Sequence, residues 1–245
     1  MKIFQVIIGT EILNGRREDK HFKFLRDALL QRGYELFSSF TVKDDPDLLE
    51  NIFSLIKKTS DSMLFCYGGI GATPDDFTRK TAAKIFTDNE MEYNKDFVNI
   101  IDQKFPNEDN SKKYLLAYWP KDAKPLWNNP VNGFPGFNVK NRYFFMPGFP
   151  QMAHPMTKEA IEKFLPKKEI KKRYTLIAYA KESEMLDIMK KIPKEVEFST
   201  LPKLDYTSEI SFAGENAKEI YEWFMLKLKE NNIKYKEATN EDQTK

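Results

Sequence analysis

Short apolar runs alternate with segments of helical periodicity along the first two thirds of the chain. Residues 3–8 and 63–67 are almost wholly apolar, which predicts buried strands, and residues 34–42 predict another strand between them. A short strand is expected at residues 142–146. The spacing of apolar positions predicts helices over residues 19–32, 46–58, 75–86, 94–105 and 151–164. Strands alternating with helices indicate a mostly parallel sheet with helices on both faces.

A second pattern begins after a basic stretch at residues 166–173. Its order, β-α-β-β-α-β, is typical of a small ferredoxin-like α+β module. The segments expected are strands at residues 174–179, 195–200, 207–212 and 233–236, with helices at residues 182–191 and around residues 217–228. We therefore expect an α/β domain over residues 1–168 and an α+β module over residues 169–237. The polar residues 238–245 are expected to form a disordered tail.

Charge and composition exclude some classes of partner. The 245 residues are 41% hydrophobic and 31% charged, which suits a globular protein with a real core. With 39 basic and 37 acidic residues the net charge is +2, so nothing indicates nucleic-acid binding. The basic stretch at residues 166–173 is interpreted as a solvated linker.

The cellular compartment is indicated by cysteine content and by the start of the chain. A single cysteine, Cys66, allows no internal disulfide and fits a reducing compartment. The opening apolar run is broken by Glu11, too early for a signal or membrane segment, so we expect a cytoplasmic protein without a membrane partner.

Acidic residues follow each of the first three predicted strands. Residues 9–11 end in Glu11, residues 43–45 end in two aspartates, and the glycine turn at residues 68–71 is followed by Asp75 and Asp76. In open α/β sheets, ligands bind outside the carboxyl ends of the strands, so these acids are expected along one edge. Backbone amides at a glycine-rich turn favour an anion such as phosphate.

Each acidic segment also has a purely structural interpretation. Thr73 as N-cap, Pro74 in the first turn and Asp76 as a capping-box acid would begin the helix expected there. Asp45 before Pro46 could likewise cap the next helix. Glu11 has no predicted helix start beside it, which makes a functional interpretation stronger for that residue.

Carboxylates around bound phosphate require a cation. Oxygen ligands suit Mg²⁺ or a similar divalent ion, which bridges carboxylates and substrate phosphates. Zinc is not expected, because the only histidines, His21 and His154, are far apart in sequence and neither has ligand spacing with Cys66. Cys66 itself is interpreted as inert packing within a strand.

Five successive motifs resemble those of the competence/damage-inducible protein A (CinA) family, in that family's order. They are IGTEILNG at residues 8–15, TVKDDPD at 41–47, GGIGATPDDFTRKTAA at 68–83, NNPVNGFPGF at 128–137 and MPGFPQMAHPM at 146–156. The match is to the N-terminal molybdopterin-binding-type domain, whose G-G-x-G…D-x-T core is shared with molybdenum-cofactor biosynthesis proteins. The C-terminal nicotinamide-mononucleotide deamidase domain of many relatives is expected to be absent.

The resemblance implies a three-layer α/β/α domain and a metal-dependent pyrophosphatase acting on ADP-ribose. It places Glu11, Asp45, Asp75 and Asp76 in the acidic set, with Asp45, Asp75 and Asp76 as catalytic residues and Asp45 and Asp76 holding a Mg, Mn or Co ion. The ligand-binding residues that it implies are Gly68, Gly69, Gly71, Thr73 and Arg79 on the phosphate side, and Asn129, Pro130, Gly136, Pro147 and Gly148 on the far side.

Three positions depart from the family pattern. Tyr67 stands where Thr is usual, Ala72 where Pro is usual, and Lys20-His21 where the family has Asn. These changes are expected to alter the choice of ligand or the activity. Two other functions stay open: a molybdopterin-binding or adenylyl-transferring protein, and a non-catalytic scaffold. Domains of this class are often oligomeric, so a homo-oligomer is expected.

Overall fold

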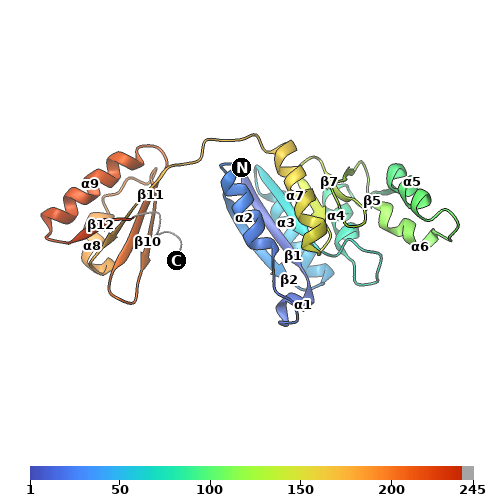
Figure 1. Ribbon diagram of the computed structural model, residues 1–245, viewed down its shortest axis with the longest axis horizontal. Coiled ribbons are helices and arrows are strands. Elements are labelled where there is room, and N and C mark those ends of the chain that lie inside the picture. The colour runs from blue at the N-terminus through green and yellow to red at the C-terminus, as the bar shows by residue number, and fades with distance from the viewer. Residues whose placement is uncertain (239–245) are drawn as a thin grey trace. The chain divides into compact units, whose positions relative to one another are not determined.

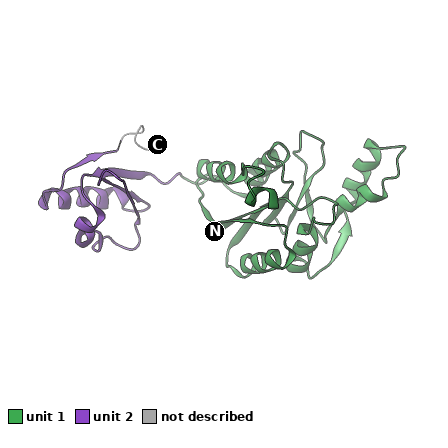
Figure 2. Cartoon of the chain, turned by 90° about the horizontal axis from the view of Figure 1, so that it is seen from below, with its two compact units in different colours: residues 1–169 green, residues 170–245 purple. Residues whose placement is uncertain are grey.

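The computed structural model describes residues 1–238. Apart from Ala238, the tail expected at residues 238–245 lies outside the described residues. The chain divides into two compact units, Met1–Glu169 and Ile170–Lys245, which Figure 2 colours separately. Each unit is described by itself.

The first unit is built on a mixed sheet in the order β2-β1-β3-β8-β7-β6. Neighbouring strands are parallel from β2 to β8, and the last two pairs, β8-β7 and β7-β6, are antiparallel. The strands are β1 (Lys2–Ile8), β2 (Leu36–Val42), β3 (Ser62–Tyr67), β6 (Lys124–Leu126), β7 (Gly136–Val139) and β8 (Tyr143–Met146). The mostly parallel sheet predicted from the sequence is confirmed.

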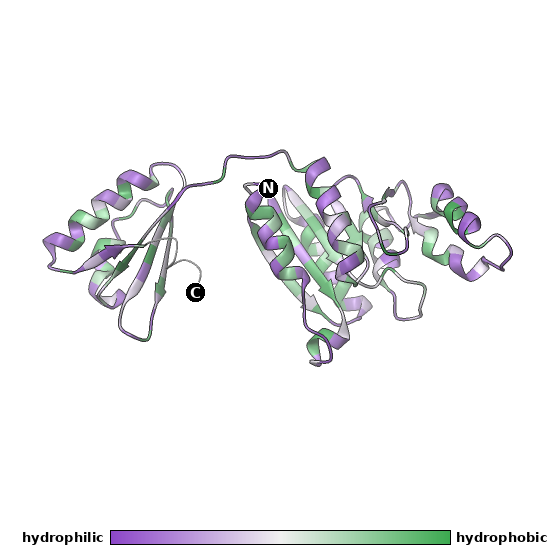
Figure 3. Ribbon diagram, in the orientation of Figure 1, coloured by the Kyte–Doolittle hydropathy of each residue, from purple (hydrophilic) through white to green (hydrophobic). Residues whose placement is uncertain are grey.

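Helices cover both faces of this sheet because its central strands are apolar on both sides. Within β1, Ile3 and Ile7 pack in one core while Phe4 and Val6 pack in the other, as the alternation of side chains along a strand requires. The first core is closed by α2 (His21–Gln31) and α7 (Pro150–Phe164), the second by α3 (Pro46–Lys58) and α4 (Thr78–Phe86) (Figure 1). Figure 3 shows the apolar colour concentrated on the strands, with polar residues along the helices. The result is the expected three-layer α/β/α domain.

A smaller subregion lies between α4 and β6 and was predicted only in part. It contains a two-stranded antiparallel sheet of β4 (Met91–Tyr93) and β5 (Tyr118–Pro120). Its helices are α5 (Lys95–Lys104), which the sequence predicted, α6 (Ser111–Tyr114) and the 3₁₀ turn η1 (Leu115–Ala117). Phe97 and Trp119 anchor it to the core, with ring centroids 5.5 Å apart.

Two helix starts differ from the prediction. Thr73 does not cap a helix, because α4 begins at Thr78 after Phe77, and residues 73–76 form a separate turn. Glu11 lies in a one-turn helix, α1 (Thr10–Leu13), which the sequence did not predict. Asp45 caps α3 as expected, since its Oδ1 accepts the Leu48 amide at 2.8 Å.

The second unit has the predicted ferredoxin-like arrangement. Its elements are β9 (Arg173–Ala178), α8 (Glu182–Met189), β10 (Glu197–Pro202), β11 (Ser208–Ala213), α9 (Ala217–Glu230) and β12 (Tyr235–Glu237). The sheet is antiparallel in the order β10-β11-β9-β12, which follows from two split βαβ halves. Its core is centred on Phe212 and Phe224.

Candidate functional site

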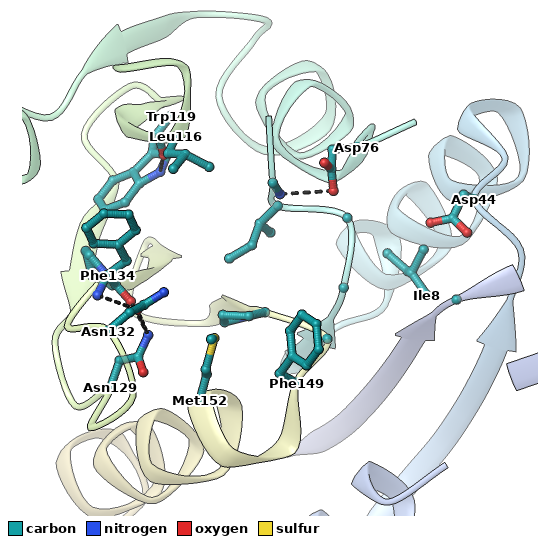
Figure 4. Close-up of a pocket in the computed structure, with 18 of the residues that line it drawn as sticks. Ile8, Asp44, Asp76, Leu116, Trp119, Asn129, Asn132, Phe134, Phe149 and Met152 are labelled. Carbon is teal, nitrogen blue, oxygen red and sulfur yellow. Dashed lines mark hydrogen bonds between the residues drawn. The ribbon is translucent and has the colours of Figure 1, made fainter. Parts of the chain in front are cut away.

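A cavity of about 540 Å³ opens at the carboxyl ends of β1, β3 and β8. This is the edge where an open α/β sheet binds ligands. The glycine turn after β3 lines one side, and residues that follow β8, including Phe149 and Met152, line another (Figure 4). The remaining wall carries Phe97, Leu116 and Trp119 from the subregion between α4 and β6, and Phe134 from the loop before β7. The cavity therefore joins a polar backbone turn to an apolar, aromatic wall.

The glycine turn requires glycine for steric reasons. Gly68 has φ +101° and Gly69 has φ +66°, both in the left-handed region. A Cβ on Gly68 would overlap the carbonyl oxygen of Ile8, and one on Gly69 would overlap the Thr78 hydroxyl. The Gly68 amide donates to the Met146 carbonyl at 2.9 Å, which ties the turn to the end of β8.

Asp76 fixes the far end of this turn. Its Oδ1 accepts the Gly71 amide at 3.0 Å, and its Oδ2 accepts the Thr73 amide at 2.8 Å; Figure 4 shows the first of these bonds. The amides of Gly69 and Ile70 have no acceptor among the described residues, and both residues line the cavity. Asp76 thus shapes the turn, while two neighbouring amides are left for a ligand.

Asp75 and Thr73 are not among the residues that line the cavity. The Asp75 carboxylate accepts the Thr73 hydroxyl at 2.5 Å, and this hydrogen bond holds the pKa of Asp75 below its usual value. Asp75 is exposed, so its contact stabilises the local turn. The catalytic role predicted for Asp75 stays a prediction without a place in the cavity.

The structure separates the neighbouring acids Asp44 and Asp45. Asp45 caps α3 outside the cavity, whereas Asp44 lines it and accepts the amide and hydroxyl of Thr10 at 3.0 and 2.8 Å. Sequence reasoning selected Asp45. The signal for Asp44 was available, because Pro46 in the first turn of α3 marks Asp45 as the N-cap.

Arg79 is not among the residues that line the cavity, although it was expected to face a phosphate. Its guanidinium is buried and donates to the carbonyls of Gly71 at 2.6 Å, Tyr118 at 3.0 Å and Leu115. Burial lowers the pKa of Arg79, while the nearby Asp76 opposes that shift. Arg79 therefore joins the glycine turn to η1 and β5. The basic side chain in the cavity wall is Arg17, which sequence reasoning missed.

The far-side residues predicted from the resemblance divide into two groups. Asn129, Pro147 and Gly148 line the cavity, whereas Pro130 and Gly136 do not. Asn129 shapes its own loop, since its Nδ2 donates to Phe134 O and Asn132 Oδ1, both at 2.7 Å. Gly136 lies within β7, where a Cβ would come 2.5 Å from the Phe145 carbonyl oxygen.

Glu11, Asp44 and Asp76 bring three carboxylates to one cavity, but their arrangement is not a closed metal cage. Among residues 1–238, no group of three or more His, Cys, Asp or Glu side chains is placed to hold a metal ion. A hard divalent ion commonly binds one or two carboxylates and completes its shell with water and ligand phosphate. Asp44 Oδ1 accepts no hydrogen bond within the described chain, so this one oxygen is open to such an ion.

Two histidines support the wall behind Gly148. His21 Nε2 lies 3.2 Å from the Gly148 carbonyl oxygen, and its ring stacks on Tyr67 with centroids 4.3 Å apart. His154 meets the edge of His21 at 5.3 Å. The Tyr67 hydroxyl pairs with Thr157 at 3.1 Å inside the core. Two of the departures from the family pattern, Tyr67 and His21, are thus in contact with each other.

Stability is expected to fall as pH drops from about 6.5 to about 4. Burial lowers the pKa of His21, and it lowers the pKa of His154 to about 4, with Asp19 opposing both shifts. Below the ordinary pKa of histidine, the unfolded chain therefore binds more protons than the folded chain. This lowers the free energy of unfolding at those pH values. The urea unfolding midpoint should decrease over this range, and less steeply in His154→Gln. A urea unfolding midpoint that does not change with pH would contradict the lowered pKa values of these two histidines.

The first unit is a three-layer α/β/α domain with a cavity at the carboxyl ends of its parallel strands. The family model described as "Probable molybdopterin binding domain" matches residues 5–167, and the chain belongs to this family. Proteins named as CinA-like or competence-damage inducible are among its relatives. A protein of Clostridioides difficile (strain 630), named as competence-damage inducible, is 31% identical over 96% of this chain and 58% of its own length.

Two further relatives cover about two thirds of this chain. A CinA-like protein of Nostoc punctiforme is 31% identical over 65% of this chain and 39% of its own length. The crystal structure of CinA from Thermoplasma acidophilum, titled as of unknown function, is 27% identical with a TM-score of 0.59, over 68% of this chain and 99% of that one. The chain thus spans only about half the length of the two curated relatives. No helix within residues 1–238 has the length and apolar character needed to cross a membrane.

Proposed function

We propose that the cavity binds a phosphorylated ligand with a flat ring and that the protein is a metal-dependent pyrophosphatase acting on ADP-ribose or a similar nucleoside diphosphate compound. The observation that carries this proposal is the composition of one cavity. The free amides of Gly69 and Ile70 suit phosphate oxygens, and the aromatic wall at Trp119 and Phe134 suits a ring.

Carboxylates in the same cavity support hydrolysis rather than binding alone. Of the acids predicted from the sequence, Glu11 and Asp76 line it, and Asp44 takes the place proposed earlier for Asp45. We assign Glu11 and Asp44 to hold a Mg²⁺, Mn²⁺ or Co²⁺ ion together with the ligand's phosphates. When bound, that ion supplies positive charge against the pyrophosphate. Asp76 is assigned to the shape of the turn.

The reaction is hydrolysis of the bond between the two phosphates. Water adds to one phosphorus, the bond from that phosphorus to the bridging oxygen breaks, and AMP and ribose 5-phosphate are released. One proton of the water must be removed, and the carboxylates of Glu11 and Asp44 are the groups to which we assign that step. The glycine-turn amides would hold the phosphate while the bond breaks.

Incubation of the pure protein with ADP-ribose and each of the three ions is expected to release AMP, measured by chromatography. Asp44→Asn should lose activity at least about 10-fold, because the amide oxygen still accepts both bonds from Thr10 while the charge is lost. Asp45→Asn is the matched control: asparagine is a good N-cap, so activity and stability should be retained. Absence of AMP with every ion would refute the pyrophosphatase proposal.

The second candidate is a molybdopterin-binding or adenylyl-transferring protein. The family description and the aromatic side of the cavity both favour a pterin-like ring. A calorimetric titration with molybdopterin distinguishes the two proposals. Saturable binding without AMP formation from ADP-ribose would favour the second candidate. The scaffold alternative would be supported if neither ligand binds.

A further inference from the structure

Arg17 lies at the cavity between α1 and α2 and is held there by two weak contacts. Its Nη1 is 3.5 Å from Glu11 Oε1, and its guanidinium carbon lies 4.9 Å from the centre of the Phe149 ring. The backbone amide of Arg17 donates to the Glu11 carbonyl at 3.0 Å, which fixes the loop. All three residues line the cavity.

The balance of charges that line the cavity gives Arg17 a specific role. Three carboxylates, those of Glu11, Asp44 and Asp76, line it, and within the described chain Arg17 is the only basic residue that does so. Arg79 cannot share this task, since its buried guanidinium is bound to backbone carbonyls. An anionic ligand that enters this cavity needs positive charge at its phosphate.

The Arg17–Glu11 pair is suited to exchange rather than to permanent pairing. At 3.5 Å it is longer than a good charge-assisted hydrogen bond, and the two side chains are 33% and 37% exposed. Exposed ion pairs of this kind contribute little to stability. The Phe149 ring, 56% exposed, keeps the guanidinium over the cavity through a cation–π contact that does not use its N–H groups.

We propose that Arg17 recognises the phosphate of the ligand by exchanging the carboxylate of Glu11 for phosphate oxygens. The planar guanidinium binds two phosphate oxygens at once, a geometry that the long contact with Glu11 lacks. The exchange releases Glu11 into the cavity when a charged phosphate is present. Arg17 thereby selects phosphorylated ligands over the corresponding unphosphorylated nucleoside or pterin. The inference rests on the proposed function only in that the cavity takes a phosphorylated ligand.

The test compares Arg17→Gln with Arg16→Gln in calorimetric titrations of the full chain. Arg16 is adjacent in the same loop, but its Nε donates to Asn14 Oδ1 at 3.2 Å and it does not line the cavity. The probes are ADP-ribose, inorganic pyrophosphate and adenosine. We expect Arg17→Gln to weaken binding of the two phosphorylated probes about 10- to 100-fold and to leave adenosine unchanged. Arg16→Gln should bind all three like the wild type.

Two further variants distinguish the exchange of Glu11 for phosphate from simple electrostatic attraction between Arg17 and phosphate. Arg17→Lys should recover part of the lost affinity, because lysine restores charge without the planar fork. Glu11→Gln should tighten pyrophosphate binding in the absence of divalent ions, since Arg17 is then no longer paired. Unchanged affinity for phosphorylated probes in Arg17→Gln, or no binding of either probe by the wild type, would overturn the inference. Binding that depends on Arg17 without AMP release would overturn only the pyrophosphatase proposal.

Discussion

Gly68→Ala is expected to lower the free energy of unfolding of the first unit by more than about 3 kcal/mol and to abolish ligand binding. The reason is backbone geometry: φ is +101°, and the new Cβ would overlap the Ile8 carbonyl oxygen. That oxygen belongs to β1, so neither partner can move without shifting a central strand. Hydrogen exchange in peptides from β1 and β3 should accelerate strongly, and the second unit serves as an internal reference.

Gly15→Ala provides the matched control. Gly15 also has a positive φ, +76°, but a Cβ there meets no atom within 4 Å. Only the left-handed conformation is then disfavoured, which costs about 1 kcal/mol. If Gly15→Ala and Gly68→Ala were equally destabilising, the close approach of the glycine turn to β1 would not be the cause.

The central fold follows directly from the sequence because its strongest patterns are physical requirements of a buried sheet. Strands β1 and β3 are apolar on both faces, so they have to be covered by helices on both sides. As far as residue 238, the second unit is equally regular, with two helices and four strands in a recognised order. In both units the period of the apolar positions and the lengths of the connections indicate the same order of elements.

The segment from β4 to β6 was harder to predict because its strands are too short to carry a period. Strands β4, β5 and β6 have three residues each, and two of them contain proline. Their pairing depends on contacts between distant residues, such as Met91 opposite Pro120. No local pattern in three residues specifies such a partner.

The candidate site was predicted at the level of the sheet edge but not of individual side chains. Strand ends identify the edge, which is why Glu11, Gly68 and Asp76 were placed at the cavity. Local turns decide which of two adjacent acids, and which of two distant arginines, faces the cavity. The turn after β3 buries Arg79, and the one-turn helix α1 brings Arg17 to the cavity instead.

Asp76→Asn is expected to weaken binding of ADP-ribose at least about 10-fold and to destabilise the first unit by about 1–3 kcal/mol. Both oxygens of Asp76 accept backbone amides, from Gly71 and from Thr73. Asparagine offers one oxygen and one NH₂ group, so either orientation places a donor against one of these amides. The glycine turn would then open, and the amides of Gly69 and Ile70 would no longer be held in place.

Asp75→Asn is the control that tests this interpretation, because the two aspartates are adjacent and carry the same charge. The Asp75 side chain accepts the Thr73 hydroxyl and its own backbone amide, and an amide oxygen can still accept a hydrogen bond there. Calorimetric titration with ADP-ribose and urea unfolding should therefore show Asp75→Asn close to the wild type. If the two variants lose affinity equally, the acidic pair acts through its summed charge, and the geometric role assigned to Asp76 is wrong. If only Asp76→Asn loses it, the carboxylate contributes by shaping the turn that receives the phosphate.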